Sequence, residues 1–263
     1  KLCEGAMCYT GDITDPSRAK YDLDYYLKLG KDLEAAGAHI LGVKDMGGLM
    51  KPAAATILFK ALKQEVGIPI HFHTHDTSGI AAASILAASE AGVDAVDAAM
   101  DSMSGLTSQP NLGSIAAALR GSERDTGLDQ RALTVISDYW EQARRNYAGF
   151  EPDIRAGTSS VYQHEMPGGQ YTNLRQQARS LGIEERWDDI ARTYAQVNHM
   201  FGDIIKVTPT SKVVGDMALM MVTSGLAPDD VMSPDREIAF PESVVQLFGG
   251  DMGQAYGGFP EEL

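Results

Sequence analysis

The feature that most restricts the fold of this chain is a unit that recurs along its first 120 residues. Each unit contains an amphipathic helix pattern, a glycine, a short apolar run and a polar tip. The glycines are Gly37, Gly67 and Gly92, at intervals of 30 and 25 residues, which suit one helix followed by one strand. Such regular alternation predicts a parallel sheet whose strands are joined by right-handed crossovers.

The apolar runs predict four strands, each followed by polar residues. The expected strands are Leu2–Cys8, His39–Val43, Ile68–Phe72 and Val93–Ala99. A TIM barrel contains eight strand–helix units, so residues 1–120 predict an α/β fold that forms half of a TIM barrel. The alternative is a small doubly wound sheet that is complete in itself. In both folds, active sites lie at the carboxyl ends of the strands.

The pattern changes after Arg120. Apolar residues at helical spacing predict helices at 128–147, 174–181, 184–200, 211–223 and 241–248, whereas 148–172 is rich in Pro, Gly and Ser and is expected to be a loop. Residues 121–263 therefore predict a helical C-terminal subdomain. Because the chain opens directly in a strand-like run, we expect it to be part of a longer protein.

Composition excludes several classes of partner. The formal net charge of −14 argues against nucleic-acid binding, which needs a basic face. No apolar run reaches the roughly 20 residues that cross a bilayer, so no membrane contact is expected. Cys3 and Cys8 are the only cysteines, which is typical of a reducing compartment. We expect a bacterial cytoplasmic location, with the mitochondrial matrix as the alternative.

The third expected strand ends in two histidines that point the same way. It reads I-P-I-H-F-H-T-H-D-T-S-G over residues 68–79. His73 and His75 are two residues apart, so their side chains share one face. Two neutral imidazoles on one face form a good half-site for a divalent metal. The alternative is a pair of buried histidines bonded to neighbouring groups. His71 shares this face one layer deeper and is interpreted as a core histidine with a hydrogen-bonded partner.

Lys44 follows the second expected strand and, in a parallel sheet, ends beside the histidine pair. A buried ammonium group is costly unless it is paired. One interpretation is an ion pair with Asp45, Asp76 or Asp97. The other is a neutral amine carbamylated by carbon dioxide, whose carbamate supplies an oxygen ligand and balances the charge of the metal.

Two polar segments are further candidates. Thr172 lies in the expected loop G-G-Q-Y-T-N, where it either caps the helix that begins near Leu174 or relays a proton through its hydroxyl. Residues 101–110 follow the fourth strand, and they either bind a small anion through hydroxyl and backbone N–H groups or simply connect strand to helix.

Five longer motifs occur one after another along the chain. They are V-K-D-M-G-G-L-M-K-P, H-T-H-D-T-S-G, D-S-M-S-G-L-T-S-Q-P, E-M-P-G-G-Q-Y-T-N-L and F-G-D-I-I-K-V-T-P-T-S-K-V-V-G-D-M-A. Together they resemble the carboxyltransferase domain of pyruvate carboxylase, a biotin-dependent ligase. The likeness covers essentially the whole chain.

The resemblance implies roles for the candidate residues. Lys44 is similar to the carbamylated lysine of that family, and His73 and His75 to two histidine ligands of a zinc or manganese ion. Thr172 resembles the threonine that carries a proton between pyruvate and biotin. The implied reaction transfers a carboxyl group from carboxybiotin to pyruvate and gives oxaloacetate. The biotin is carried on another domain, and the parent enzyme is a tetramer.

The resemblance also implies that parts are missing. The four strands correspond to the last four of the barrel, and the aspartate ligand of the first barrel strand has no counterpart here. No biotin attachment site is present, and the residues of the biotin pocket are unknown. We therefore expect the isolated chain to be inactive. The alternatives are an oxaloacetate decarboxylase or transcarboxylase subunit, which the stretch Met103–Pro110 disfavours, and a non-catalytic oligomerisation fragment.

Overall fold

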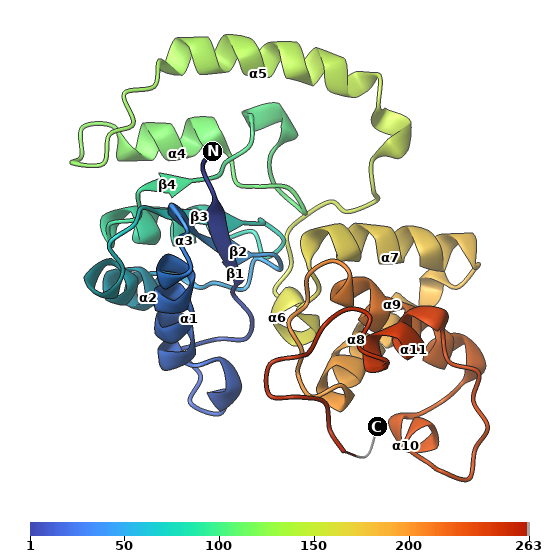
Figure 1. Ribbon diagram of the computed structural model, residues 1–263. Coiled ribbons are helices and arrows are strands. Elements are labelled where there is room, and N and C mark those ends of the chain that lie inside the picture. The colour runs from blue at the N-terminus through green and yellow to red at the C-terminus, as the bar shows by residue number, and fades with distance from the viewer. Residues whose placement is uncertain (262–263) are drawn as a thin grey trace. The chain divides into compact units, whose positions relative to one another are not determined.

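The computed structural model describes residues 1–261 and contains a parallel sheet with the strand order β1-β2-β3-β4 (Figure 1). The strands are β1 Glu4–Cys8, β2 Ile40–Asp45, β3 Ile70–Thr74 and β4 Ala95–Val96. The predicted α/β fold with a parallel sheet is confirmed. Both β1 and β4 lie at the edges of the sheet within the described residues.

Helices α1 (Leu23–Ala35), α2 (Pro52–Glu65), α3 (Ala81–Glu90) and α4 (Leu112–Leu119) follow the strands in turn. Their ends match the local sequence signals. The Asp22 carboxylate accepts a hydrogen bond from Tyr25 N at the start of α1, and the Asn111 side chain accepts from Ser114 N at the start of α4. Such caps satisfy backbone N–H groups that have no partner within the helix.

Alternate residues of β3 face opposite ways. Ile70 and Phe72 are fully buried, and the Phe72 ring lies 4.9 Å from the Phe59 ring of α2. His71 and His73 are half-buried on the opposite face. The helices thus cover the apolar face of the sheet, and the histidines occupy the other.

The fourth strand is shorter than expected, because only Ala95–Val96 is fully paired. Sheet hydrogen bonds nevertheless extend beyond it, since Asp94 N donates to Ile70 O and Asp97 N donates to Phe72 O, both at 3.0 Å. The second strand is longer than expected and includes Lys44 and Asp45.

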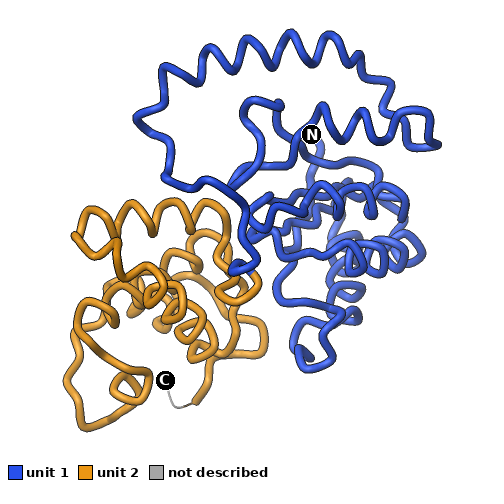
Figure 2. The backbone as a smooth tube through the Cα atoms, turned by 180° about the vertical axis from the view of Figure 1, so that it is seen from behind, with its two compact units in different colours: residues 1–161 blue, residues 162–263 orange. Residues whose placement is uncertain are grey.

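The chain folds into two compact units, residues 1–161 and 162–263 (Figure 2). This division differs from the change of pattern after Arg120, because helix α5 (Gln130–Arg145) packs on η2 (Asp101–Met103) of the first unit. There, Ser102 Oγ donates to the Ser137 carbonyl at 2.9 Å. Residues 262 and 263 of the expected C-terminal subdomain lie outside the described residues.

The second unit is helical. It contains α7 (Gly168–Ser180), α8 (Trp187–Met200), α9 (Thr210–Ser224), α10 (Pro228–Val231) and α11 (Glu242–Phe248), with α6 (Val161–His164) where the units meet in sequence and η4 (Glu184–Arg186) before α8. Among residues 1–261, no helix has both the length and the apolar character that a bilayer crossing requires.

The prediction of a loop over residues 148–172 is wrong where the chain forms helices. This segment contains η3 (Ala148–Phe150) and α6, and α7 already begins at Gly168. Tertiary packing overrides the poor helix propensity of Gly168 and Gly169. Gln170 is buried, and a Cβ atom at Gly215 of α9 would overlap with its side-chain nitrogen. The absence of a side chain at Gly215 thus leaves room for the buried Gln170 side chain of α7.

Asp45 stabilises the turn that follows β2. Its side chain is fully buried and accepts from Leu49 N at 2.8 Å, Met50 N at 2.9 Å and the Thr74 hydroxyl at 2.8 Å. Burial raises the pKa of this carboxyl to about 6, although these hydrogen bonds oppose the shift. One carboxylate thus joins the ends of β2 and β3.

We predict that Asp45→Ala destabilises the chain by at least about 3 kcal/mol, because it leaves three buried donors without an acceptor at roughly 1–3 kcal/mol each. Urea unfolding followed by circular dichroism measures the change. Asp138→Ala, at an exposed position of α5, is the matched control and should change stability by less than about 0.5 kcal/mol. Equal losses in both variants would contradict this role for Asp45.

Candidate metal centre

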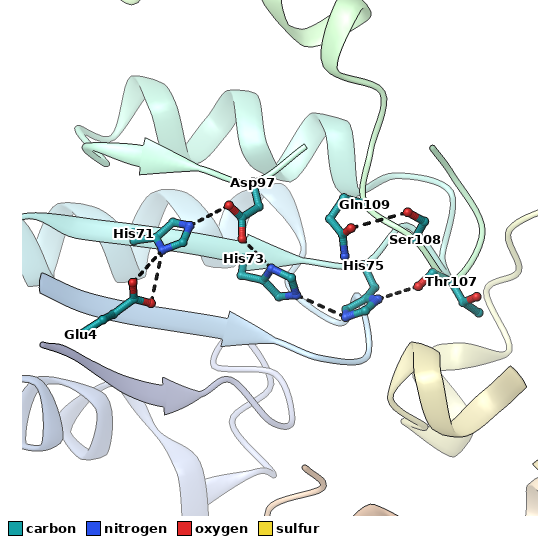
Figure 3. Close-up of polar contacts among 8 residues, drawn as sticks. All are labelled: Glu4, His71, His73, His75, Asp97, Thr107, Ser108 and Gln109. Atoms are coloured by element: carbon teal, nitrogen blue, oxygen red, sulfur yellow. Dashed lines mark hydrogen bonds and ion pairs between the residues drawn. The ribbon is translucent and has the colours of Figure 1, made fainter. Parts of the chain in front are cut away.

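The two predicted histidine ligands converge at the carboxyl end of β3. His73 Nε2 and His75 Nε2 are 3.3 Å apart, and the two rings meet edge to face with centroids 5.1 Å apart. Figure 3 shows both rings directed toward this shared point. The sequence spacing therefore brings the imidazoles together as expected.

The hydrogen bonds on the other ring nitrogens fix the chemistry of this pair. His73 Nδ1 lies 2.6 Å from Asp97 Oδ2, and His75 Nδ1 lies 2.6 Å from the Thr107 carbonyl oxygen. A carbonyl or an ionised carboxylate only accepts hydrogen bonds, so both Nδ1 atoms carry a proton. When the rings are neutral, both Nε2 atoms present lone pairs to one point. Metal-binding histidines are oriented by this kind of partner.

The separation of the lone pairs fits a tetrahedral metal site. Zinc–nitrogen bonds of about 2.0–2.1 Å at a tetrahedral angle place two ligand nitrogens roughly 3.3 Å apart. The observed 3.3 Å between the Nε2 atoms agrees with this value. Two lone pairs at this distance repel one another unless a cation lies between them. Among residues 1–261, however, no group of three or more His, Cys, Asp or Glu side chains is arranged to hold a metal.

Lys44 is positioned beside the pair by the sheet register. It is the direct partner of His73 in the β2–β3 pairing and of Cys8 in the β1–β2 pairing. Burial lowers the pKa of His75, and the charge of Lys44 adds a smaller shift in the same direction. Burial raises the pKa of the Cys8 thiol, and the charge of Lys44 opposes that shift. The register thus places Lys44 on the strand next to His73, while its role as a ligand stays a prediction.

The expected ion pair of Lys44 does not form. Asp45 is engaged by Leu49, Met50 and Thr74, Asp76 Oδ1 accepts from Ala81 N at 3.0 Å, and Asp97 is bound by histidines. Among the described residues, no carboxylate lies within ion-pair distance of the Lys44 amine. This ion-pair interpretation is wrong because other donors engage each of the three carboxylates.

Three hydrogen-bond partners of the histidines are not predicted by the sequence. The sequence offers Asp97 only as a partner for Lys44, and it does not indicate that Glu4 or Thr107 contacts a histidine. Thr107 belongs to the loop 101–110, where Gly105 and Leu106 adopt positive φ angles of 83° and 54°. This backbone turns the Thr107 carbonyl toward His75 (Figure 3). The available signal for Asp97 was its position, because it is a polar residue at the end of the strand that neighbours the histidine strand.

His71 has hydrogen-bonded partners, as expected. Its Nδ1 lies 3.2 Å from both carboxylate oxygens of Glu4, and its Nε2 lies 2.9 Å from Asp97 Oδ1. Burial lowers the pKa of His71, but the hydrogen bonds to Asp97 and Glu4 outweigh it, so that the pKa is raised. For His75 burial prevails and the pKa is lowered, although the Thr107 carbonyl opposes the shift.

Thr172 belongs to the second unit, whereas His73 and His75 belong to the first. It is the fifth residue of α7, and its hydroxyl donates to the Gly168 carbonyl at 3.4 Å. The interpretations as an N-cap near Leu174 and as a loop residue are both wrong, because the helix starts earlier. Its role in proton transfer stays a prediction.

Comparison with known proteins identifies the family. Residues 12–139 match the family described as HMGL-like, and residues 161–263 match the conserved carboxylase domain. The chain is 52% identical to pyruvate carboxylase of Bacillus subtilis over 263 residues and 48% identical to the mitochondrial enzyme of Homo sapiens. These alignments cover 100% and 99% of this chain.

Solved structures agree with this relationship. The chain is 66% identical to the carboxyltransferase domain of Rhizobium etli pyruvate carboxylase solved with pyruvate and biocytin, with a TM-score of 0.99. The match covers all of this chain and 44% of that domain. The chain belongs to the pyruvate carboxylase family, within its carboxyltransferase region. It spans 23% of the Bacillus subtilis relative and 22% of the human one.

We predict that His75 loses its proton at a lower pH than His71, because burial dominates at His75 and carboxylates dominate at His71. The unfolded value is about 6.5 for both. His75 therefore destabilises the fold as pH falls below about 6.5, whereas the stability contributed by His71 is lost as pH rises through its folded pKa. Proton NMR titration of the six histidines measures both. The reverse order would contradict the assignment.

Proposed function

We propose that this chain provides part of a carboxyltransferase site that moves a carboxyl group from carboxybiotin to pyruvate and forms oxaloacetate. One observation carries the proposal. The His73 and His75 Nε2 atoms share a point at the carboxyl end of a parallel sheet, in a chain 66% identical to a carboxyltransferase domain solved with pyruvate and biocytin. Enzymes of this architecture carry out their chemistry at that end of the sheet.

The proposal includes a wider architecture. Residues 1–120 contribute the last four strand–helix units of a TIM barrel, and 121–263 contribute a helical subdomain. The open edges of β1 and β4 support an incomplete cylinder, since a barrel leaves no free strand edge. The remaining domains of the parent enzyme, including the one that carries biotin, are its partners, and we propose a homo-oligomer. Relatives are bacterial and mitochondrial, so the bacterial cytoplasm or the mitochondrial matrix is the proposed location.

We propose His73, His75 and carbamylated Lys44 as ligands of a zinc or manganese ion. The ion would act as a Lewis acid that stabilises negative charge on a bound oxyanion. The imidazoles contribute lone pairs and no charge, because their N–H groups are directed to Asp97 and Thr107. Lys44 supports the site in its carbamylated form, since an ammonium group beside the ion would repel it.

The chemistry assigned to the reaction requires one proton carrier. The methyl group of pyruvate loses a proton, the resulting enolate carbon forms a bond with carbon dioxide released from carboxybiotin, and the biotin nitrogen gains the proton. We propose Thr172 as the carrier. Thr208 is a rival from another of the five motifs. Its side chain is exposed, and its hydroxyl has no hydrogen-bond partner among the described residues.

We predict that a Rhizobium etli carboxyltransferase domain whose matching segment is replaced by this chain is active. Biotin-dependent decarboxylation of oxaloacetate, followed as pyruvate formation, measures activity. His73→Asn and His75→Asn should each lower kcat by at least about 100-fold, as the loss of transition-state stabilisation predicts. His199→Asn, at an exposed position of α8, is the control. The isolated 263-residue chain should show no turnover, and measurable oxaloacetate chemistry by it would contradict that expectation.

The Thr172 assignment requires that Thr172→Val in the same exchanged domain lower kcat by about 100-fold or more with little change in KM, because proton transfer contributes roughly 10²–10⁴-fold. Thr208→Val is measured in parallel. A large loss in Thr208→Val, with Thr172→Val near wild type, would move the role to Thr208. The Ser counterparts of both variants keep the hydroxyl and should restore activity only at the true carrier.

A further inference from the structure

A continuous chain of polar contacts crosses all four strands of the sheet (Figure 3). It starts at Glu4 of β1, passes to His71 of β3, then to Asp97 after β4, and returns to His73 of β3. From there it reaches His75. The separations are 3.2 Å for Glu4–His71, 2.9 Å for His71–Asp97 and 2.6 Å for Asp97–His73.

A glycine in the strand between them makes this path available. Gly42 of β2 pairs with His71 on one side and with Ala6 on the other. A Cβ atom at Gly42 would overlap with Oε1 of Glu4. The Glu4 side chain therefore passes over β2 at the one position that has no side chain there. An alanine at position 42 would force Glu4 away from His71.

Asp97 is the branch point of the chain. Oδ1 faces His71 Nε2, and Oδ2 faces His73 Nδ1. The carboxylate therefore accepts one hydrogen bond on each oxygen and is held between two rings. A carboxylate that is hydrogen-bonded through both oxygens has a fixed orientation. Its orientation determines in turn which nitrogen of His73 carries the proton.

A purely stabilising role does not account for this arrangement. The side chains of Glu4 and Asp97 are 35% and 41% exposed, so water is available to both carboxylates. Ion pairs at this exposure contribute little to stability, roughly 0–1 kcal/mol. The shortest of the three contacts, at 2.6 Å, is the one that Asp97 makes to a proposed metal ligand, His73.

We propose that Asp97 is a positioning residue that holds His73 in the Nδ1–H tautomer with Nε2 directed to the metal position, and that Glu4 and His71 hold Asp97 in place across Gly42. This inference deepens the proposed function, because the metal ligation on which it acts belongs to that proposal. Asp97 and His71 are proposed to act through His73 and not as metal ligands.

The test compares the full 263-residue chain with Asp97→Ala, Asp97→Asn and Gly42→Ala. Gly149→Ala is the matched control, because a Cβ atom there meets nothing within 4 Å. Long-range ¹⁵N–¹H correlation of the ¹⁵N-histidine-labelled chain reports the tautomer of each ring. Competition with a chromophoric chelator measures the affinity for Zn²⁺ alone. Circular dichroism and thermal unfolding report whether each variant folds.

In Asp97→Ala, we expect His73 to lose the NMR signature of a single Nδ1–H tautomer. We also expect the Kd for Zn²⁺ to rise about 10–100-fold, as when other hydrogen-bond partners of metal-binding histidines are removed. Asp97→Asn keeps one acceptor oxygen, so it should retain the tautomer and lose less affinity. Gly42→Ala should change the His71 and His73 signals without touching a ligand, and Gly149→Ala should change neither. If Asp97→Ala fails to fold, Gly42→Ala decides.

Two outcomes separate this inference from the proposed function. If the wild-type chain binds Zn²⁺ and all variants keep both the affinity and the His73 tautomer, the positioning role is overturned and the metal site stands. If the wild-type chain binds no Zn²⁺ but His73 changes tautomer in Asp97→Ala, the positioning role stands and the metal assignment fails.

Discussion

The site depends on the register between two parallel strands. Lys44 and Asp45 of β2 pair with His73 and Thr74 of β3. A slip of one residue would turn every side chain of a strand to the other face, so that His73 would point at the helices and Phe72 away from them. The buried face prevents this slip, because Phe72 packs against Phe59. The site is therefore held in place by the apolar face opposite to it.

Much of the first unit was predictable because its signals are local. Glycines after amphipathic helices, apolar runs and capping residues such as Asp22 act within a few residues, and a parallel topology follows from their order. The convergence of His73 and His75 rests on the same kind of argument, since alternation along one strand determines it. These predictions needed no knowledge of distant contacts.

The partners of the histidines were not predictable, because each is distant in sequence. Asp97 is 24 residues from His73, Thr107 is 32 residues from His75, and Glu4 is 67 residues from His71. The early start of α7 was missed for a similar reason, since glycine disfavours a helix and the packing of Gln170 against Gly215 joins residues distant in sequence. Local propensity carries no information about such contacts.

The distribution of charge fits the proposed function, in which the site would bind a cation and act on an anion. The carboxylates of Glu4 and Asp97 face imidazole N–H groups rather than the point between the two Nε2 atoms. Neutral ligands leave the charge of a divalent ion largely intact, which preserves its strength as a Lewis acid. The state of Lys44 then decides the balance. In the proposed site, an ammonium group at Lys44 would repel the ion, whereas a carbamate would supply a ligand and cancel one unit of its charge.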